Sequence, residues 1–473
     1  MNGIYRFINT NVPTLGCNLR CDYCYIRQHG DEDILDIKKR DSLFKYSVEH
    51  MISALTVERL GGVCMFNISG SGETLLCPDI FEICEGLLRN GHYIAIISNC
   101  TVTKEIEKFI RLKQEYRDRL FFKASFHYQE LKRRNLLNTY ASNINALKKN
   151  GIAFSIEIVS NDGVLSELEE LKAWTEKEFG ALPHVLAGRS ETKLGEFPKF
   201  ETCLSEEEFF ETWDEFKSPL FDYQYTDYVL PHNDEFCHAG VYTGSLEMAT
   251  GVFFACPGNK KITNMFENTE EPIRFAPMAK ACPFPYCFCG FFLQVLAGAC
   301  NESYNPNVVF GEFRDRKCTD GSHWLTPSIK EVFSHKCSEF HNPLTSAKKT
   351  YLNALMKKRY GMENEINIDE YNEVTKEIKY KLKSLKIDKV VIYGYGGIGQ
   401  LIYDILNDAG IEVVALMDKR YKEIEAKIPV YSPEDAPKEG DAIIVSIFYD
   451  YTEIAPKLRN ITEKKILSVI DII

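Results

Sequence analysis

Hydrophobic and polar positions alternate in a regular way along the first 190 residues. Short runs of β-branched and aromatic residues are separated by longer segments whose apolar positions recur every three or four residues. The predicted strands are Ile4–Ile8, Val63–Ser69, Tyr93–Ser98, Leu120–Phe126, Ala153–Val159 and Pro183–Leu186. The predicted helices are Ser42–Leu60, Asp79–Asn90, Lys104–Tyr116, Asn138–Asn150 and Ser166–Phe179. Six strand–helix units predict an α/β fold, a partial (β/α)6 barrel of the TIM type over residues 1–190.

The rest of the chain divides into three further regions by the same pattern. Residues 191–300 begin with an irregular, acidic and aromatic linker and continue into a cysteine-rich region. Residues 301–384 predict a helical connector, with helices at Pro343–Arg359 and Asp369–Leu385. Residues 385–473 return to alternating strands and helices. Their predicted strands are Lys389–Tyr393, Glu412–Met417, Ala442–Ile447 and Ile466–Ile470.

Composition narrows the class of protein. The chain has 473 residues, 45% hydrophobic and 26% charged, with a formal net charge of −12. This balance is typical of a soluble protein of two or three domains and argues against a nucleic-acid or anionic-membrane partner. No export signal is visible, and the apolar stretch Phe291–Ala299 is too short to cross a bilayer. We therefore expect a cytoplasmic protein, and its total of 16 cysteines favours metal clusters over disulfides.

Three of those cysteines stand together after the first predicted strand. Cys17, Cys21 and Cys24 have the spacing C-x3-C-x2-C. A [4Fe–4S] cluster normally takes four cysteines, so a loop with three leaves one iron open for a small molecule. The alternatives are a zinc site or three buried thiols. Zinc prefers four ligands, usually from two cysteine pairs, and no second cysteine pair stands nearby in the sequence to complete such a site.

With Tyr23 between them, these cysteines resemble the signature of the radical SAM superfamily. The resemblance implies that Cys17, Cys21 and Cys24 are catalytic, since they hold the cluster whose open iron binds S-adenosylmethionine (SAM). In that family one electron from the cluster splits SAM, and the resulting 5′-deoxyadenosyl radical takes a hydrogen atom from the substrate. A one-electron reductant such as flavodoxin or ferredoxin is then an expected partner.

The resemblance also assigns SAM contacts at the ends of the predicted strands. Ser71, Gly72 and Glu73 are similar to the family's GGE motif, and Glu73 is expected to accept from the SAM ammonium. Asn99 stands in a turn similar to the TNG-like turn of the family, and Ser125 is expected at the SAM ribose or carboxylate. Tyr23 could stack on the adenine. The alternative for Glu73 is a plain turn with a solvated carboxylate.

A second cysteine group resembles the twitch or SPASM extension, which binds auxiliary clusters. Its members are Cys237, Cys256, Cys282, Cys287 and Cys289, with Gly251 and Cys256 in a G-x4-C hairpin. Five cysteines are available for the four thiolates of one auxiliary [4Fe–4S] cluster, so one is spare. The alternative is a structural zinc ribbon.

The C-terminal region carries a nucleotide-binding pattern. Gly394, Gly396 and Gly399 follow a buried strand and open a helix, and Asp418 ends the next strand 19 residues later. That context is typical of a Rossmann loop, in which backbone and helix N-terminus face a pyrophosphate and the acid binds the ribose. The unit is only half of a Rossmann fold, so a bound nucleotide is more consistent with it than hydride transfer. The alternative is a docking or dimerisation module.

Together these features predict a radical SAM enzyme that oxidises or epimerises a small molecule, for which a nucleotide-linked sugar is one candidate. A SPASM-type peptide maturase remains open within the same chemistry. Two alternatives come from other classes: an NAD-dependent oxidoreductase with structural metal sites, and a non-catalytic Fe–S electron-transfer protein.

Overall fold

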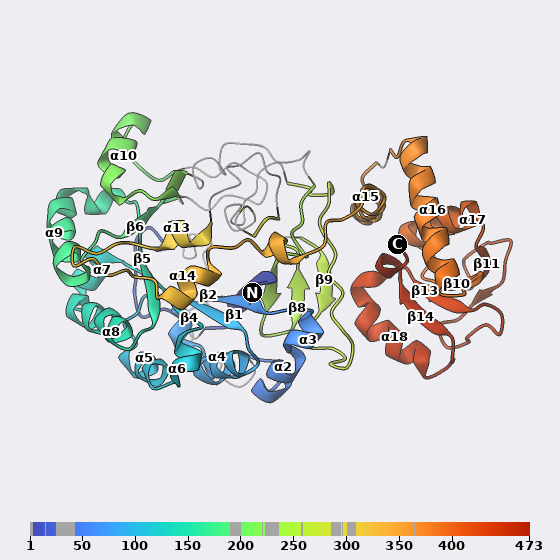
Figure 1. Cartoon of the computed structure of the whole chain (residues 1–473), viewed down its shortest axis with the longest axis horizontal. Coiled ribbons are helices and arrows are strands. Elements are labelled where there is room, and N and C mark those ends of the chain that lie inside the picture. Colours follow the sequence, from blue (N-terminus) through green and yellow to red (C-terminus); the bar gives the residue numbers. More distant parts are fainter. Residues whose placement is uncertain are drawn as a thin grey trace.

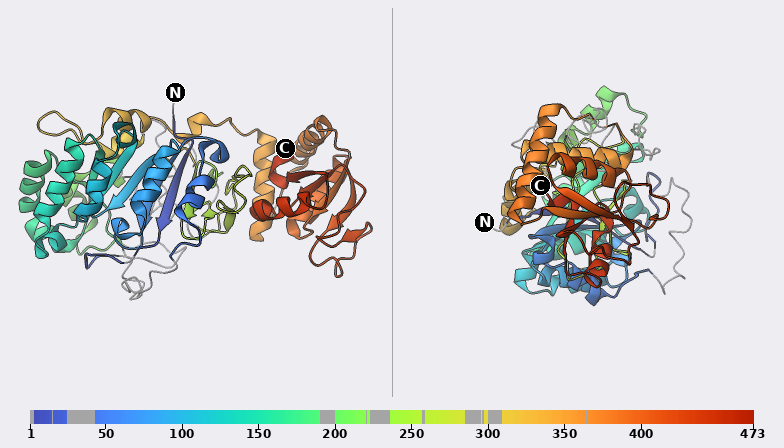
Figure 2. Two further views of the ribbon diagram at one scale, coloured as in Figure 1. Left: turned by 90° about the horizontal axis from the view of Figure 1, so that it is seen from below. Right: turned by 90° about the vertical axis from the view of Figure 1, so that its right-hand side faces the viewer.

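The structure is a computed structural model that forms two bodies (Figures 1 and 2). It describes residues 3–14, 16–24, 43–189, 200–219, 221–222, 236–256, 259–284, 295, 297–299, 309–363 and 365–473. A nine-stranded sheet forms the centre of the larger body, and a five-stranded sheet forms the centre of the smaller, C-terminal body. No helix among the described residues is long and apolar enough to cross a membrane.

Six parallel neighbouring strands make the partial barrel. They are β1 (Arg6–Val12), β2 (Cys64–Gly70), β3 (Tyr93–Ser98), β4 (Leu120–Ser125), β5 (Ala153–Val159) and β6 (His184–Leu186). The prediction of six parallel strands is confirmed, and β3 and β5 match it to the residue. Because all six run in one direction, their carboxyl ends meet at one edge of the sheet, where the cysteine loop follows β1.

Helices cover the outer face of this sheet. They are α2 (Val48–Ala54), α3 (Val57–Leu60), α4 (Ile80–Arg89), α5 (Thr103–Ile110), α6 (Gln114–Arg117), α7 (Tyr128–Arg133), α8 (Leu137–Lys149) and α9 (Leu168–Phe179). Two predicted helices are each divided in two. The first is interrupted at Leu55, and Thr56 then caps α3 by accepting a hydrogen bond from the backbone N–H of Arg59. A Thr at a helix start stabilises that start, so the apolar periodicity alone overestimated the length.

The inner face of the sheet is covered by two short helices, α13 (Phe310–Arg314) and α14 (Pro327–Val332). The Phe121 and Phe333 rings meet edge to face at a centroid distance of 5.3 Å, and Phe7 packs on Phe310 at 5.4 Å. The sequence predicted a connector here. In the structure these helices instead pack against the barrel and lie across the strands in Figure 1.

Three more strands extend the sheet beyond β1: β7 (Thr243–Glu247), β8 (Val252–Phe254) and β9 (Lys261–Asn264). Strand β7 pairs with β1 in parallel, and β7, β8 and β9 form an antiparallel meander. Gly251, with a φ of 78°, stands in the tight turn before β8, which confirms the predicted hairpin. A further short helix, α10 (Glu206–Thr212), lies in the segment that the sequence predicted to be irregular.

The C-terminal body begins with α15 (Ser346–Tyr360) and α16 (Ile368–Ser384). Its parallel sheet has the order β12-β11-β10-β13-β14. The remaining elements are β10 (Lys389–Tyr393), α17 (Gly397–Asp408), β11 (Glu412–Met417), β12 (Val430–Tyr431), β13 (Ala442–Val445), α18 (Tyr451–Arg459) and β14 (Lys465–Ser468). The predicted order of strand, glycine loop, helix and strand is confirmed. Ion pairs join this body to the larger one, among them Lys261 with Asp450 and Arg274 with Asp471.

Candidate active site

The cysteine loop leaves β1 at the carboxyl edge of the barrel. Cys21 is buried, and Cys17 and Cys24 are half-buried. The backbone N–H of Cys24 donates to the carbonyl of Cys21 at 3.3 Å, and the Leu19 N–H points at the Cys17 sulfur at 3.4 Å. Burial raises the pKa of the Cys21 thiol to about 12, and the nearby Cys17 and Cys24 thiols add to that shift. The three thiols are therefore close enough to interact electrostatically.

The three cysteine thiols suit an iron–sulfur cluster both in ligand type and in number, since three thiolates leave one iron of a cubane open. Each iron of a cubane takes its own thiolate, so the three sulfurs need to surround a cluster and need not meet at a point. Among the described residues, no three Cys, His, Asp or Glu side chains are placed to hold a metal ion as they stand. The assignment of Cys17, Cys21 and Cys24 as cluster ligands stays a prediction that rests on chemistry and loop placement.

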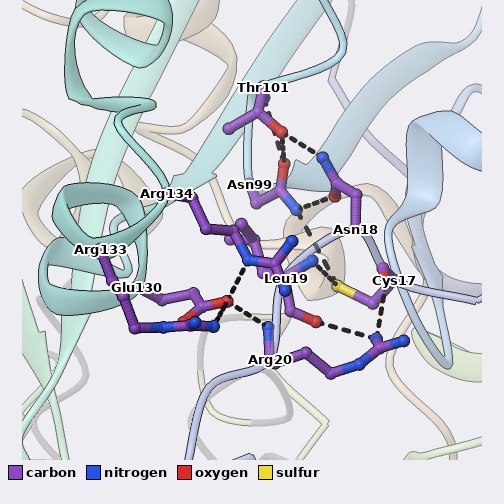
Figure 3. Close-up of polar contacts among 9 residues, drawn as sticks. All are labelled: Cys17, Asn18, Leu19, Arg20, Asn99, Thr101, Glu130, Arg133 and Arg134. Carbon is purple, nitrogen blue, oxygen red and sulfur yellow. Dashed lines mark hydrogen bonds and ion pairs between the residues drawn. The ribbon is translucent and has the colours of Figure 1, made fainter.

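Glu130 on α7 fastens the middle of the loop (Figure 3). Its Oε1 accepts a hydrogen bond from the backbone N–H of Arg20 at 2.8 Å, and the carboxylate also binds the guanidinium groups of Arg133 and Arg134. The Arg20 side chain in turn donates to the carbonyl of Cys17 at 2.8 Å. Glu130 is 7% exposed, so water competes little with these contacts. The sequence analysis missed this residue, because nothing local marks it as a partner of the loop.

Asn99, in the turn after β3, lies against the start of the same loop (Figure 3). Its amide nitrogen donates to the side-chain oxygen of Asn18 at 2.8 Å and lies 4.0 Å from the Cys17 sulfur. Asn18 donates in turn to Thr101 at 2.7 Å. The predicted approach of this turn to the cysteines is therefore present. The Asn99 side chain contacts the loop itself, a role that the sequence did not predict.

The turn after β2 touches the loop from a third side. The backbone N–H of Glu73 donates to the carbonyl of Gly16 at 2.9 Å. A Cβ on Gly72 would lie 2.2 Å from that carbonyl oxygen, so only glycine fits. The Glu73 carboxylate is 2% exposed and accepts hydrogen bonds from the Ser98 hydroxyl at 2.6 Å and the Asn99 N–H at 2.8 Å. Glu73 thus joins this turn to the end of β3.

The other predicted SAM contacts lie around the same edge. The Tyr23 hydroxyl is 2.8 Å from Nδ1 of His127, and their rings are tilted by 34° at 5.9 Å. Burial lowers the pKa of His127 to about 4, so this imidazole is neutral at pH 7. Ser125 is the last residue of β4 and is half-buried, and Ser71 is exposed. No contact among the described residues tests the expected roles of Tyr23, Ser71 and Ser125 toward SAM.

A cavity of about 550 Å³ opens beside the loop. Cys21 and Tyr23 line one side, and residues that follow β4, β5 and β6 line the other, among them Arg133 and Asp162. Glu201 also lines it, although the sequence analysis assigned no chemistry to that segment. The cavity is polar and is large enough for a small molecule.

Three cysteines of the second group also come together. Burial raises the pKa of Cys282 to about 12, and the nearby Cys256 and Cys237 thiols add to the shift. Cys256 follows β8, and the Cys237 backbone pairs with Ala279 just before Cys282. Cys287 and Cys289 lie outside the described residues. The assignment of Cys237, Cys256 and Cys282 to one auxiliary cluster stays a prediction, as does the fourth ligand.

The glycine loop of the C-terminal body has a close-packed and an open side. A Cβ on Gly399 would lie 2.0 Å from the carbonyl oxygen of Gly394, whereas a Cβ on Gly396 would meet nothing within 4 Å. Asp418 was predicted to bind a ribose. In the structure it is 8% exposed, and its carboxylate accepts from the backbone N–H of Tyr395 at 2.7 Å and of Arg420 at 2.8 Å. Asp418 therefore shapes the glycine loop.

Comparisons with known protein structures return distant likenesses. SuiB of Streptococcus suis bound to S-adenosylmethionine is 14% identical with a TM-score of 0.38, over 56% of this chain and 64% of SuiB. The protein anSMEcpe with bound AdoMet and a peptide is 14% identical with a TM-score of 0.37, over 56% of this chain and 78% of that one. Archaeal TYW1 is 16% identical with a TM-score of 0.23, over 33% and 50%. The chain thus spans less than two thirds of SuiB, and such scores carry no argument about substrate.

A comparison with curated proteins finds no match. Two family models do match parts of the chain. Residues 389–447, from β10 through β13, match the PglD N-terminal domain. Residues 11–173 match the radical SAM superfamily, and this range contains the three cysteines, the turns at Glu73 and Asn99, and the four barrel strands β2 to β5. The chain therefore carries a domain of the radical SAM superfamily.

Proposed function

We propose that this chain is an enzyme that cleaves SAM reductively and abstracts a hydrogen atom from a small-molecule substrate. The observation that carries the proposal is the three-cysteine loop at the carboxyl edge of the radical SAM domain. Glu130, Asn99 and the turn at Gly72 each fasten it from a different strand end. A polar cavity opens beside the same loop.

The chain's own residues have distinct roles in this proposal. Cys17, Cys21 and Cys24 would hold a [4Fe–4S] cluster, which when bound supplies the electron that splits SAM into methionine and the 5′-deoxyadenosyl radical. Glu130, Asn18 and Asn99 keep the loop in place. The backbone of the turn at Gly72 contacts the loop at Gly16 and would help to hold it in place.

The second cysteine group and the glycine loop extend the proposal. We assign Cys237, Cys256 and Cys282 to an auxiliary cluster, with Cys287 or Cys289 as a further ligand. Oxidation of an alcohol to a carbonyl removes two electrons and two protons. The radical takes one hydrogen atom, so the remaining electron needs an acceptor, for which the auxiliary cluster is suited, and the remaining proton needs a base or water. The glycine loop at Gly394, Gly396 and Gly399 is assigned to a nucleotide, which would make a nucleotide-linked substrate a suitable ligand.

The test is iron content and electron paramagnetic resonance of anaerobically purified protein, with and without SAM. Wild type is compared with a Cys17/Cys21/Cys24→Ala variant, and Cys203→Ala, at an exposed thiol, is the matched control. We expect about eight irons to fall to about four in the triple variant, with loss of the signal that SAM perturbs. The 5′-deoxyadenosine formed after reduction is measured in the same samples.

Other outcomes would select other functions. A signal indifferent to SAM, with no 5′-deoxyadenosine, would contradict the proposal and favour an Fe–S electron carrier. Retention of a nicotinamide-dependent activity in the triple variant would favour an NAD-dependent oxidoreductase. Cleavage of SAM that is stimulated by peptides and not by small molecules would keep the chemistry and change the substrate.

A further inference from the structure

A lysine is buried on the inner face of the barrel. Lys123 lies on β4 two residues after Phe121, whose ring packs on this face against Phe333. Because side chains alternate along a strand, Lys123 points to the same inner face. Its side chain is 7% exposed, and among the described residues its ammonium has no hydrogen bond and no ion pair within 4 Å, although the charge of Glu157 acts on it. Buried charges are normally paired, so such a lysine indicates a missing ligand.

A second cation lies beside it. Arg314, at the end of α13, is 1% exposed and pairs with Glu157 on β5, which also accepts from the Ser155 hydroxyl at 3.2 Å. The Nε of Arg314 is enclosed and has no hydrogen-bond partner among the described residues. Glu157 is paired with Ser125 in the strand register, so it shares the inner face with Lys123. One carboxylate therefore faces two cations.

The remaining groups on this part of the face do not balance that charge. Strand register places His184 next to Glu157, and burial keeps its pKa well below the usual value, so the ring is neutral at pH 7. Glu247 is on β7, four strands away from β4 in the sheet, and binds Asn11 at 2.7 Å. The region around Lys123 thus carries one excess positive charge among the described residues.

We propose that Lys123 and Arg314 form a binding site for an anionic group, a carboxylate or phosphate, carried by the substrate of this enzyme. The inference rests on the proposed function and names the class of its substrate. The oxygens of a carboxylate or phosphate can accept hydrogen bonds from the Lys123 ammonium and from the Arg314 Nε–H together. These charge-assisted hydrogen bonds are stronger than those to a neutral acceptor. A bound anion also compensates the desolvation of Lys123.

The SAM carboxylate is the competing source of such an anion. The cysteine loop follows β1, and its contacts described above come from the turns after β2 and β3, at Gly72 and Asn99, and from Glu130 after β4. Lys123 lies on β4, and its partners lie on β5 and α13, so the cations occupy the other half of the inner face (Figure 1). Ser125, two residues after Lys123 on the same face of β4, is itself expected at the SAM ribose or carboxylate, so the experiment has to separate SAM from the substrate.

The experiment measures the reactivity of Lys123 in the full-length, anaerobically reconstituted protein. Trace acetylation with acetic anhydride, read by peptide mass spectrometry, gives a rate for each lysine across pH. The probes are sodium formate and inorganic phosphate, with formamide as the uncharged control, and the exposed Lys104 is the internal reference. Burial and the Arg314 charge hold the pKa of Lys123 at about 8, so part of it is free amine near pH 8. A bound anion should raise this pKa by about one unit and slow acetylation about tenfold.

Separate arms distinguish the source of the anion. SAM and 5′-methylthioadenosine, which lacks the carboxylate, are tested alone. Protection of Lys123 by formate and phosphate, but not by SAM alone, supports the proposal. Full protection by SAM and none by 5′-methylthioadenosine would overturn it, as would indifference of Lys123 to both anions.

A second measurement does not depend on whether acetic anhydride can reach Lys123. Phosphate should raise the melting temperature of wild type, and Lys123→Met should abolish that rise. An equal rise in both proteins would overturn the proposal. Because 5′-deoxyadenosine is measured in the same samples, SAM cleavage without any anion effect refutes this inference alone. An anion effect without SAM cleavage refutes the proposed function alone.

Discussion

Glu130 accepts a hydrogen bond at 2.8 Å from the backbone N–H of Arg20, 110 residues earlier in the chain. The contact joins the middle of the cysteine loop to the helix that follows β4. Arg133 and Arg134 also bind the Glu130 carboxylate and hold it in the position from which it contacts the loop. The geometry of the three cysteines therefore depends on a residue that is not itself a ligand.

Replacing Glu130 with Gln should loosen that loop. The amide keeps the shape but loses the charge-assisted hydrogen bonds to Arg133 and Arg134, at a cost of about 1–3 kcal/mol. We expect less iron bound per chain and slower SAM cleavage, with the circular dichroism spectrum unchanged. Glu170→Gln is the control, since Glu170 also binds a cation, Lys132, but is 60% exposed. Equal iron content in Glu130→Gln and wild type would show that the contact does not position the loop.

Adding one methyl group at Gly72 should have a larger effect. The new Cβ would lie 2.2 Å from the carbonyl oxygen of Gly16, so the turn and the cysteine loop must move apart. We expect Gly72→Ala to fold and to lose the SAM-dependent change in the electron paramagnetic resonance spectrum. In Gly311→Ala the added Cβ meets only ordinary contacts from 3.6 Å outward, so this variant is the control. A normal response to SAM in Gly72→Ala would show that the close approach is unimportant.

The glycine loop of the C-terminal body offers a matched pair of variants. Gly399→Ala places a Cβ 2.0 Å from the Gly394 carbonyl oxygen and should destabilise the body itself. Gly396→Ala meets nothing within 4 Å and should leave the melting temperature unchanged. If a nucleotide phosphate lies against this loop, the same methyl group occupies its space, and calorimetric titration should show weakened binding. Nucleotide binding unchanged in Gly396→Ala would exclude this loop as the phosphate site.

The sequence was most informative where a feature depends on neighbours along the chain. Runs of apolar residues predict strands β3 and β5, and the spacing of Cys17, Cys21 and Cys24 predicts that all three lie on one short loop. Contacts made by packing were not predictable in the same way. The pair of Arg314 with Glu157 joins residues 157 positions apart. Asp418 shows a related limit: its spacing from the glycines fits a ribose contact, but spacing does not reveal that the carboxylate is bonded to the loop.

The buried ion pair of Arg314 and Glu157 should behave as a unit. Arg314→Met leaves a carboxylate buried next to an unpaired lysine and should cost about 3–5 kcal/mol of unfolding free energy. In a Glu157→Gln background the same substitution should cost less, because the carboxylate that Arg314 binds is already absent. The measurement is a double-mutant cycle from urea unfolding of the larger body. Additive free energies would mean that the two side chains do not stabilise each other.

The contact between the two bodies should depend on pH through two facing glutamates. Glu267 follows β9 and faces Glu453 on α18, with Lys45 at 3.8 Å from Glu267 and Lys261 at 3.4 Å from Glu453. Burial, together with the hydrogen bond and charge of Glu453, raises the pKa of Glu267 from 4.5 to about 7. When protonated, Glu267 can donate to Glu453. When ionised, it repels that carboxylate.

A carboxyl group whose pKa is raised by folding stabilises the folded state below its unfolded pKa and loses that contribution as pH rises. The contact should therefore weaken between pH 4.5 and about 7, by an amount on the order of 1 kcal/mol after solvent screening. The melting temperature of Glu267→Gln minus that of wild type should become more positive across this window, since the amide does not ionise. Glu270→Gln, at an exposed neighbour, should show no such trend. A difference that stays constant with pH would show that Glu267 does not titrate at this contact.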